Sequence, residues 1–358
     1  MFKRIDSYIM KKFLGAFFLS ICLILSIAVV LDVSEKLDDF MEKSIPLKDI
    51  VFSYYLNFIP YMASLFAPLF VFISCIFFTS KMAENTEIIA IQAAGVSYRR
   101  MLLPYMLVAT LIALLSFFLS SYVIPPANKE RLDFQETLKK KKRATDVSNV
   151  QMEIEKGVVL TIKSYNRESK TGFSASLEKF NNKELVSRMT ARVIKWDTLH
   201  NWKMSGYIIR DFDGLHEHLV RGEKIDTVLN VEPEEFFVYS GMEEQMTTPE
   251  LKRYIDRQKS RGMGEVKSFE IEYAKRFASP FASFILTIIG VSLSSKKVRG
   301  GMGTNLGIGL FLSITYIFFF TISSTFAVSG SMSPTLAAWF PNILFIGIAF
   351  YCYSKAQK

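Results

Sequence analysis

The side chains that carry most enzyme chemistry are few in this sequence of 358 residues, and they form no catalytic pattern. There is no Walker A loop and no H-E-x-x-H, G-x-S-x-G or C-x-x-C motif. His216 and His218 share a predicted strand face, and we interpret them as ordinary surface residues. The three cysteines lie in apolar stretches and predict packing side chains. We therefore expect a chain that is not an enzyme and that holds no metal or cofactor.

A second group of reactive side chains lies in the polar segment Lys81–Arg100. Glu87–Ala94 has the apolar spacing of a short amphipathic helix, and Gly95 is placed to be its C-cap. Glu84 precedes this helix and Arg99 follows it, so both signs of charge are present for a docking contact. Two interpretations stay open. The helix is a lever on which a soluble partner pulls, or it merely joins two membrane spans.

Uncharged apolar stretches fill the first third and the last quarter of the chain. Half of the residues are hydrophobic, and the mean hydropathy is +0.23. A spanning helix needs about 20 apolar residues. Six segments meet this need when the last stretch is divided at Ser329–Ser331, before Pro334. They are 13–31, 61–80, 101–124, 277–295 and the two parts of 300–354. No ionisable residue lies within them, which argues against an ion-driven transporter.

The distribution of charge predicts the orientation of these six spans. The two termini and the second and fourth loops hold twelve basic and three acidic residues, a net charge of +9. The first loop carries −3 and the long middle segment +3. Because basic loops stay in the cytoplasm, we expect both termini to be cytoplasmic. The N-terminal apolar run lacks a cleavage site and is interpreted as a retained anchor.

The polar middle of the chain predicts an extracytoplasmic β-domain. Residues 128–142 continue the third span as a helix. Five β-rich runs then recur at roughly ten-residue spacing, which favours an antiparallel sandwich or barrel. The predicted strands are 158–162, 173–180, 189–196, 202–209 and 218–229. A capping box from Thr247 to Glu250 predicts a helix that leads back to the fourth span.

Several motifs together resemble one family along the whole chain. Thr86–Gly95, followed by Arg99 and Arg100, looks like the coupling-helix signature of the LptF/LptG (YjgP/YjgQ) permeases. The remaining resemblances are at Tyr122–Asn128, at Lys296–Gly303, and at Pro334, Trp339, Pro341 and Asn342.

This resemblance implies a permease of an ABC-type lipopolysaccharide exporter in the inner membrane of a Gram-negative bacterium. The implied partners are a second LptF/LptG-like chain, an LptB-like ATPase dimer that binds ATP and Mg, and LptC-like and LptA-like bridge proteins. The implied organisation is helices 1–3 at 1–127 with a coupling helix at about 84–95, a periplasmic β-jellyroll at 128–275, and helices 4–6 at 276–358. The implied coupling residues are Glu84, Glu87, Ile91, Gly95 and Arg99.

The lipid contacts that the resemblance implies differ from some relatives of the LptG type. Such chains have several lysines near the outer end of the first span, whereas Lys36 is the only base within Leu31–Asp39 here. Lys275 and Arg276 are possible substitutes, and an inward position such as Ile162 is expected to meet lipid. The surrounding acids are alternatively ligands for divalent ions. The Glu35–Asp39 stretch favours LptG over LptF. The competing hypothesis is a membrane scaffold whose β-domain only docks envelope proteins.

Overall fold

A computed structural model describes residues 4–138, 146–181, 184–198, 200–214, 216–237, 241–260, 266–296 and 301–356. The chain forms two compact units. The helical unit comprises Met1–Leu138, Glu243–Leu251 and Lys267–Lys358, and the β unit comprises Lys139–Met242 and Lys252–Val266.

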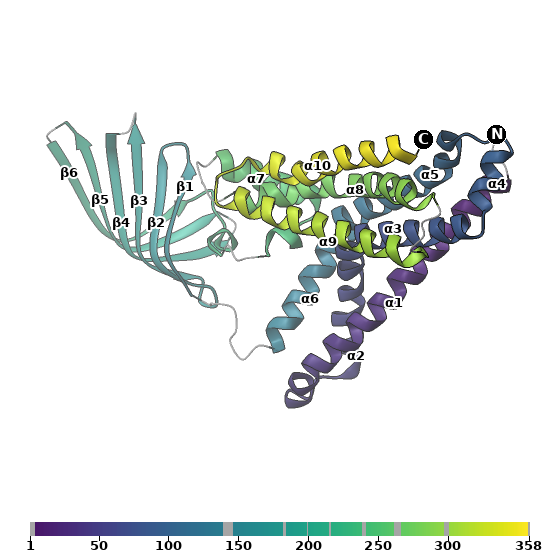
Figure 1. Ribbon diagram of the computed structural model, residues 1–358. Helices are drawn as coiled ribbons and strands as arrows, with labels where there is room; N and C mark the ends of the chain where they lie inside the picture. Colours follow the sequence, from purple (N-terminus) through teal and green to yellow (C-terminus); the bar gives the residue numbers. More distant parts are fainter. Residues whose placement is uncertain are drawn as a thin grey trace. The chain divides into compact units, whose positions relative to one another are not determined.

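The helical unit contains six helices that are long and apolar enough to cross a membrane, which confirms the prediction of six spans (Figure 1). The helices are longer than the predicted apolar segments, because charged residues at the end of an apolar segment do not end the helix. The elements are α1 Arg4–Glu42, α2 Leu47–Asp49, η1 Ile50–Tyr55, α3 Leu56–Glu84, α4 Glu87–Ala93, α5 Tyr98–Phe118, η2 Leu119–Val123, α6 Ile124–Leu138, α8 Lys267–Ser294, α9 Gly301–Val328 and α10 Pro334–Ala356.

The helix α8 lies at the centre of this unit, whereas α1 and α9 lie at its periphery. In the most apolar window of each helix, 61% of α8 is buried but only 11% of α1 and 22% of α9. The buried positions of α1 are concentrated toward its N-terminus, where Ile9, Phe13 and Phe17 pack into one cluster with α3 and α5. Helix α1 is thus anchored mainly at the end that lies near α4.

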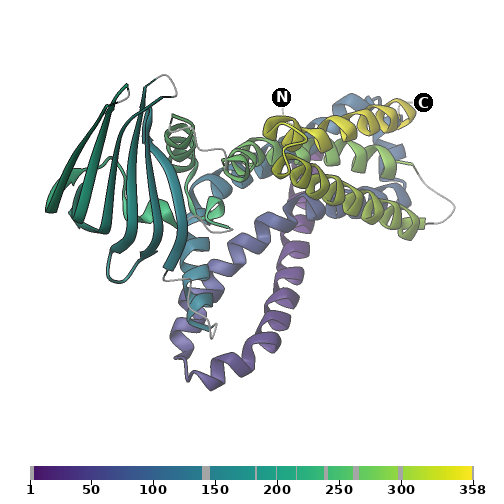
Figure 2. The same cartoon turned by 90° about the vertical axis from the view of Figure 1, so that its left-hand side faces the viewer.

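The β unit contains one six-stranded antiparallel sheet whose strands follow one another in chain order (Figure 2). This confirms the predicted antiparallel β-domain between the third and fourth spans and supplies a strand order that the sequence left open. A first strand, β1, was not predicted. The strands are β1 Asp146–Glu155, β2 Val158–Asn166, β3 Thr171–Asn181, β4 Glu184–Thr198, β5 Asn201–Asp213 and β6 His216–Val228. The helix α7 Thr248–Ser260 follows.

The apolar face of the sheet is covered by the segment that follows β6 and not by a second described sheet. Val231, Phe236 and Phe237 of this segment join the buried core of the sheet. The Trp202 indole is fully buried and donates its N–H to the Val231 carbonyl at 3.2 Å. A single sheet can therefore bury one face without a partner sheet, because the chain beyond β6 folds back onto it.

A row of six residues, one from each strand, interrupts the pairing of the sheet at one level. The register is the same on both sides of this row, but the inward-facing positions change from one alternate set to the other across it, so each strand carries one additional residue there. Ile162 and Tyr165 of β2, which flank the additional residue, both lie in the core. The six residues, called the kink row below, are Asn149, Lys163, Ser174, Arg192, Gly206 and Glu223.

Alternate strands adopt an unusual backbone conformation at the kink row. The φ angles of Asn149, Ser174 and Gly206 are +57°, +53° and +64°, a region that non-glycine residues rarely occupy. An additional residue of this kind normally bends one strand and breaks its register. Here all six strands carry it at the same level, so the strands stay in register while the inward and outward alternation shifts by one residue across the row.

Candidate functional sites in the helical unit

The short helix α4 has one face packed into the helical unit and one face exposed. Ile88 is only 2% exposed and Ile91 is half-buried, and both join the cluster formed by α1, α3 and α5. Ile89, by contrast, is 57% exposed. Glu84 and Arg99, at the two borders of α4, are exposed. The amphipathic helix that the sequence predicts is therefore present, and its outer face carries both apolar and charged side chains.

Gly95 ends α4 in the manner that its position predicts. Its φ is +83°, and its N–H donates to the Gln92 carbonyl at 2.9 Å. The Val96 N–H donates to the Ile91 carbonyl at 3.3 Å. These two bonds form a Schellman motif, which satisfies the last carbonyls of the helix and requires a left-handed residue at this place.

Replacing Gly95 by alanine is expected to weaken α4 by about 1–2 kcal/mol, because a Cβ disfavours the left-handed conformation. Hydrogen exchange of the α4 amides in detergent should become correspondingly faster. Gly15→Ala is the control, since a Cβ at Gly15 meets nothing within 4 Å and its φ is not positive. Unchanged α4 exchange in Gly95→Ala would contradict this account of the cap.

The Glu87 carboxylate connects α4 to the start of α1. It accepts a hydrogen bond from the Tyr8 hydroxyl at 3.2 Å and one from the Asn85 amide at 3.3 Å. Thr86, immediately before the helix, has a φ of +62°. The chain thus enters and leaves α4 through left-handed residues, which fixes the direction of this short helix between α3 and α5.

A second link between α1 and the α4 region was missed by the sequence analysis. The Arg100 guanidinium donates to both carboxylate oxygens of Asp6, at 2.9 and 2.6 Å, and the Asp6 residue is only 4% exposed. Bidentate pairs of this kind are strong and directional. The neighbouring Arg99 has no ion pair within the described part of the chain. Of the two adjacent arginines, one fastens α5 to α1 and the other remains available at the surface.

At the far end of α3 lies a cavity of about 570 Å³. Tyr61, on its wall, lies 23 residues before Glu84 on α3, which corresponds to about 35 Å of helix. The apolar wall comes mainly from α3 and α9. The lining residues are Tyr61, Ser64, Leu65, Pro68, Ser120, Ile124, Asn128, Glu244, Glu272, Lys275, Arg276, Ser279, Tyr316, Ile317, Phe320, Thr321, Ser324, Thr325 and Val328.

Lys275 and Arg276 both line this cavity, but their side chains make different contacts. Arg276 is only 3% exposed and donates to the Glu272 carboxylate, the Thr248 hydroxyl and the Glu243 carbonyl, each at 3.2 Å. The Lys275 ammonium instead lies 5.3 Å from the centre of the Phe320 ring. Arg276 is thus held in place by protein groups, whereas Lys275 places a positive charge against the apolar wall.

Other polar residues at this cavity escaped the sequence analysis. Glu244 accepts from the Asn128 amide at 3.1 Å, and Asn128 in turn accepts from the Arg131 guanidinium. Glu272 is paired with Arg276. Nothing in the local sequence marks these residues, although Asn128 lies within the Tyr122–Asn128 motif. Together they make one end of the cavity charged.

The two remaining predicted lipid contacts lie elsewhere. Lys36 binds Asp32 and the Tyr54 hydroxyl, with its ammonium 4.6 Å from the centre of the Tyr54 ring. It is therefore engaged in a polar cluster between α1 and η1. Ile162 is fully buried in the core of the β unit. The structure thus brings only Lys275 and Arg276 together, and within the described residues no group of three or more carboxylate, histidine or cysteine side chains is placed to hold a metal ion.

These features define a class of protein. Six apolar helices identify a multi-pass membrane protein, and a cavity with apolar walls and a charged end suits an amphiphilic ligand. Residues 7–355 match the family described as lipopolysaccharide export system permease LptF/LptG. The chain belongs to this LptF/LptG family, and the match does not separate LptF from LptG. A comparison with curated protein sequences found no match.

Proposed function

We propose that this chain is a membrane subunit of an ABC-type exporter that removes lipopolysaccharide from the inner membrane, with both termini in the cytoplasm. The energy comes from an LptB-like ATPase dimer, which binds ATP and Mg. A second LptF/LptG-like chain completes the channel, and LptC-like and LptA-like proteins receive the lipid. The observation that carries this proposal is the presence of two sites in the helical unit, the α4 surface and the amphiphilic cavity, at opposite ends of α3.

The α4 surface is the proposed contact for the ATPase. Ile88 anchors the helix inside, while Glu84, Ile89 and Arg99 face outward. A short capped helix transmits force only when it is attached to its neighbours. The hydrogen bond from Tyr8 to Glu87 supplies such an attachment to α1, and the nearby bridge from Arg100 to Asp6 holds the same part of α1 against α5. Movement of α4 is therefore expected to move the first span.

The cavity is the proposed place of the lipid in the membrane. Its α3 and α9 walls suit acyl chains, and the Lys275 ammonium suits a lipid phosphate. Arg276 holds the charged end in shape through its three hydrogen bonds. Lys36 is proposed as a second phosphate contact when its cluster opens. The apolar face of the β unit, where Ile162 lies, is the proposed path of the acyl chains out of the membrane.

A photocrosslinking amino acid at Phe320 tests this proposal in the complete complex. It is expected to capture lipopolysaccharide, and ATP turnover should change the yield. A crosslinker at Ile162 should capture lipid only during turnover. The control is Phe311, which lies on α9, is 68% exposed and does not line the cavity. No capture at Phe320 or Ile162, or no co-purifying ATPase, would favour the scaffold hypothesis.

A further inference from the structure

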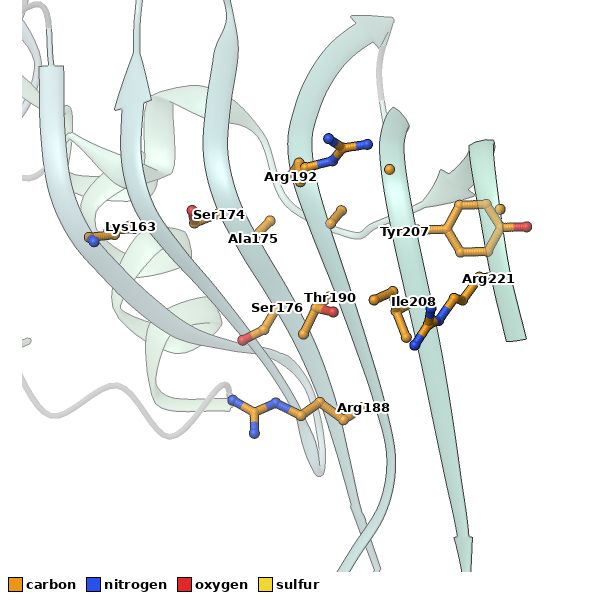
Figure 3. A pocket seen from close by; sticks show the side chains of 13 residues that line it. Lys163, Ser174, Ala175, Ser176, Arg188, Thr190, Arg192, Tyr207, Ile208 and Arg221 are labelled. Carbon is orange, nitrogen blue, oxygen red and sulfur yellow. The ribbon is translucent and has the colours of Figure 1, made fainter. Parts of the chain in front are cut away.

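The outward face of the β unit carries a shallow hollow at the kink row. Its volume is about 640 Å³, and it extends over strands β2 to β6. Figure 3 shows the long cationic side chains that reach over it from β2, β4 and β6. The polar side chains used below are Lys163, Arg188, Arg192, Arg221, Ser176 and Thr190.

The charge of this hollow is one-sided. Four of its lining residues are lysine or arginine, and none is aspartate or glutamate. Arg188 pairs with Glu178 at 3.1 Å. Lys163, Arg192 and Arg221 have no ion pair within the described residues of the β unit. Three positive charges thus remain uncompensated in one depression, which attracts an anion.

Two cations elsewhere on the same sheet form ion pairs with acidic residues. Lys203 pairs with Asp197 at 3.1 Å, and this hydrogen bond raises the pKa of the Lys203 ammonium. Arg210 pairs with Glu217 at 3.5 Å. These two cations outside the hollow are paired with acids, whereas three of the four that line it have no ion pair within the described residues.

The kink row helps to place these cations. Lys163 and Arg192 belong to the row itself, on alternate strands. The Arg192 guanidinium lies over Gly206, where a Cβ would come within 2.5 Å of its Nε atom. The absence of a side chain at Gly206 thus makes room for Arg192. In this position the exposed guanidinium can offer its paired donors to an oxyanion.

We infer that this hollow binds the phosphorylated saccharide headgroup of the exported lipid. Arginine favours the planar, two-point recognition of phosphate oxygens. The Ser176 and Thr190 hydroxyls, between the cations, provide neutral donors and acceptors for sugar hydroxyls. A shallow open surface suits a hydrated headgroup, while acyl chains require the opposite, apolar face. This inference rests on the proposed function, because the family exports a lipid that carries a polysaccharide.

Calorimetric titration of the full-length chain in detergent, without any ATPase, tests the inference with glucosamine 6-phosphate as the probe. The triple variant Lys163→Gln, Arg192→Gln, Arg221→Gln is expected to bind about tenfold more weakly or worse, because charge-assisted hydrogen bonds are lost. The charge-matched control replaces three cations that do not line the hollow, Lys195→Gln, Lys203→Gln and Lys224→Gln, and is expected to keep the wild-type affinity.

Four results would overturn the inference. They are equal binding by the wild type and the hollow variant, equal binding of unphosphorylated glucosamine, equal affinity for inorganic phosphate alone, and equal displacement by an acidic peptide of the same charge. A matching unfolding midpoint for both triple variants shows that the domain is intact. The test needs no transport, so a negative result here leaves ATP-dependent capture at Phe320 intact, and a failure of that capture leaves probe binding measurable.

Discussion

Replacing Arg276 by alanine is expected to lower the free energy of unfolding of the helical unit by about 3–5 kcal/mol, because it leaves a buried polar network with an unpaired charge. Arg276 holds together the start of α8 and the segment around Glu243 and Thr248. Its removal also leaves the Glu272 carboxylate, which lies beside the cavity, without the cation that it pairs with. Thermal unfolding of the purified chain in detergent measures the loss.

A variant that removes both members of the pair, Arg276 and Glu272, provides the control. The double variant Arg276→Met, Glu272→Leu removes both charges and is expected to be more stable than Arg276→Ala, since no carboxylate is left without its cation. Lys11→Ala, at an exposed position of α1, should change stability by less than about 0.5 kcal/mol. A single variant as stable as the wild type would show that the network contributes nothing.

Glu87→Ala is expected to reduce ATP-dependent lipid release about tenfold, because the loss of a hydrogen bond to a charged group costs about 1.5 kcal/mol. The carboxylate also lies in the first turn of α4, where a negative charge favours the helix. Release from proteoliposomes into a soluble acceptor, together with ATP hydrolysis, measures the effect.

Tyr8→Phe separates the two possible roles of this carboxylate. It removes only the hydroxyl that binds Glu87 and leaves the charge on the α4 surface. If attachment to α1 carries the force, Tyr8→Phe should reproduce most of the loss. If contact with the ATPase dominates, release by Tyr8→Phe should stay near the wild-type level. Normal release by Glu87→Ala would refute the coupling role altogether.

The sequence predicts those parts of the fold that depend on local patterns. Six spans follow from apolar runs, and α4 follows from the spacing of its isoleucines with Gly95 at the end. The strand β1 was missed because its first residues are polar and alternation becomes regular only at Val150, Met152 and Ile154. The strand predicted at 158–162 ended four residues short of the observed β2, because the regular alternation of its side chains stops at Lys163 in the kink row.

The candidate site residues were predictable only where the chemistry is local. Lys275 and Arg276 are adjacent, and their place at a span end was readable. The pairing of Asn128 with Glu244 joins residues 116 apart, and that of Asp6 with Arg100 joins residues 94 apart. No spacing rule reports such contacts, since they depend on which helices pack together. The amphiphilic character of the cavity therefore emerged only from the three-dimensional structure.

The kink row also determines which kinds of length change the sheet tolerates. Deleting a single residue at this level in one strand would move every later side chain of that strand to the opposite face of the sheet. The apolar side chains of that strand would then be exposed. Point replacements there leave the alternation untouched. The six strands therefore share a common length constraint: the row can be shortened only by coordinated changes in neighbouring strands, and its side chains can vary only where the backbone conformation and the available space allow, which excludes Gly206.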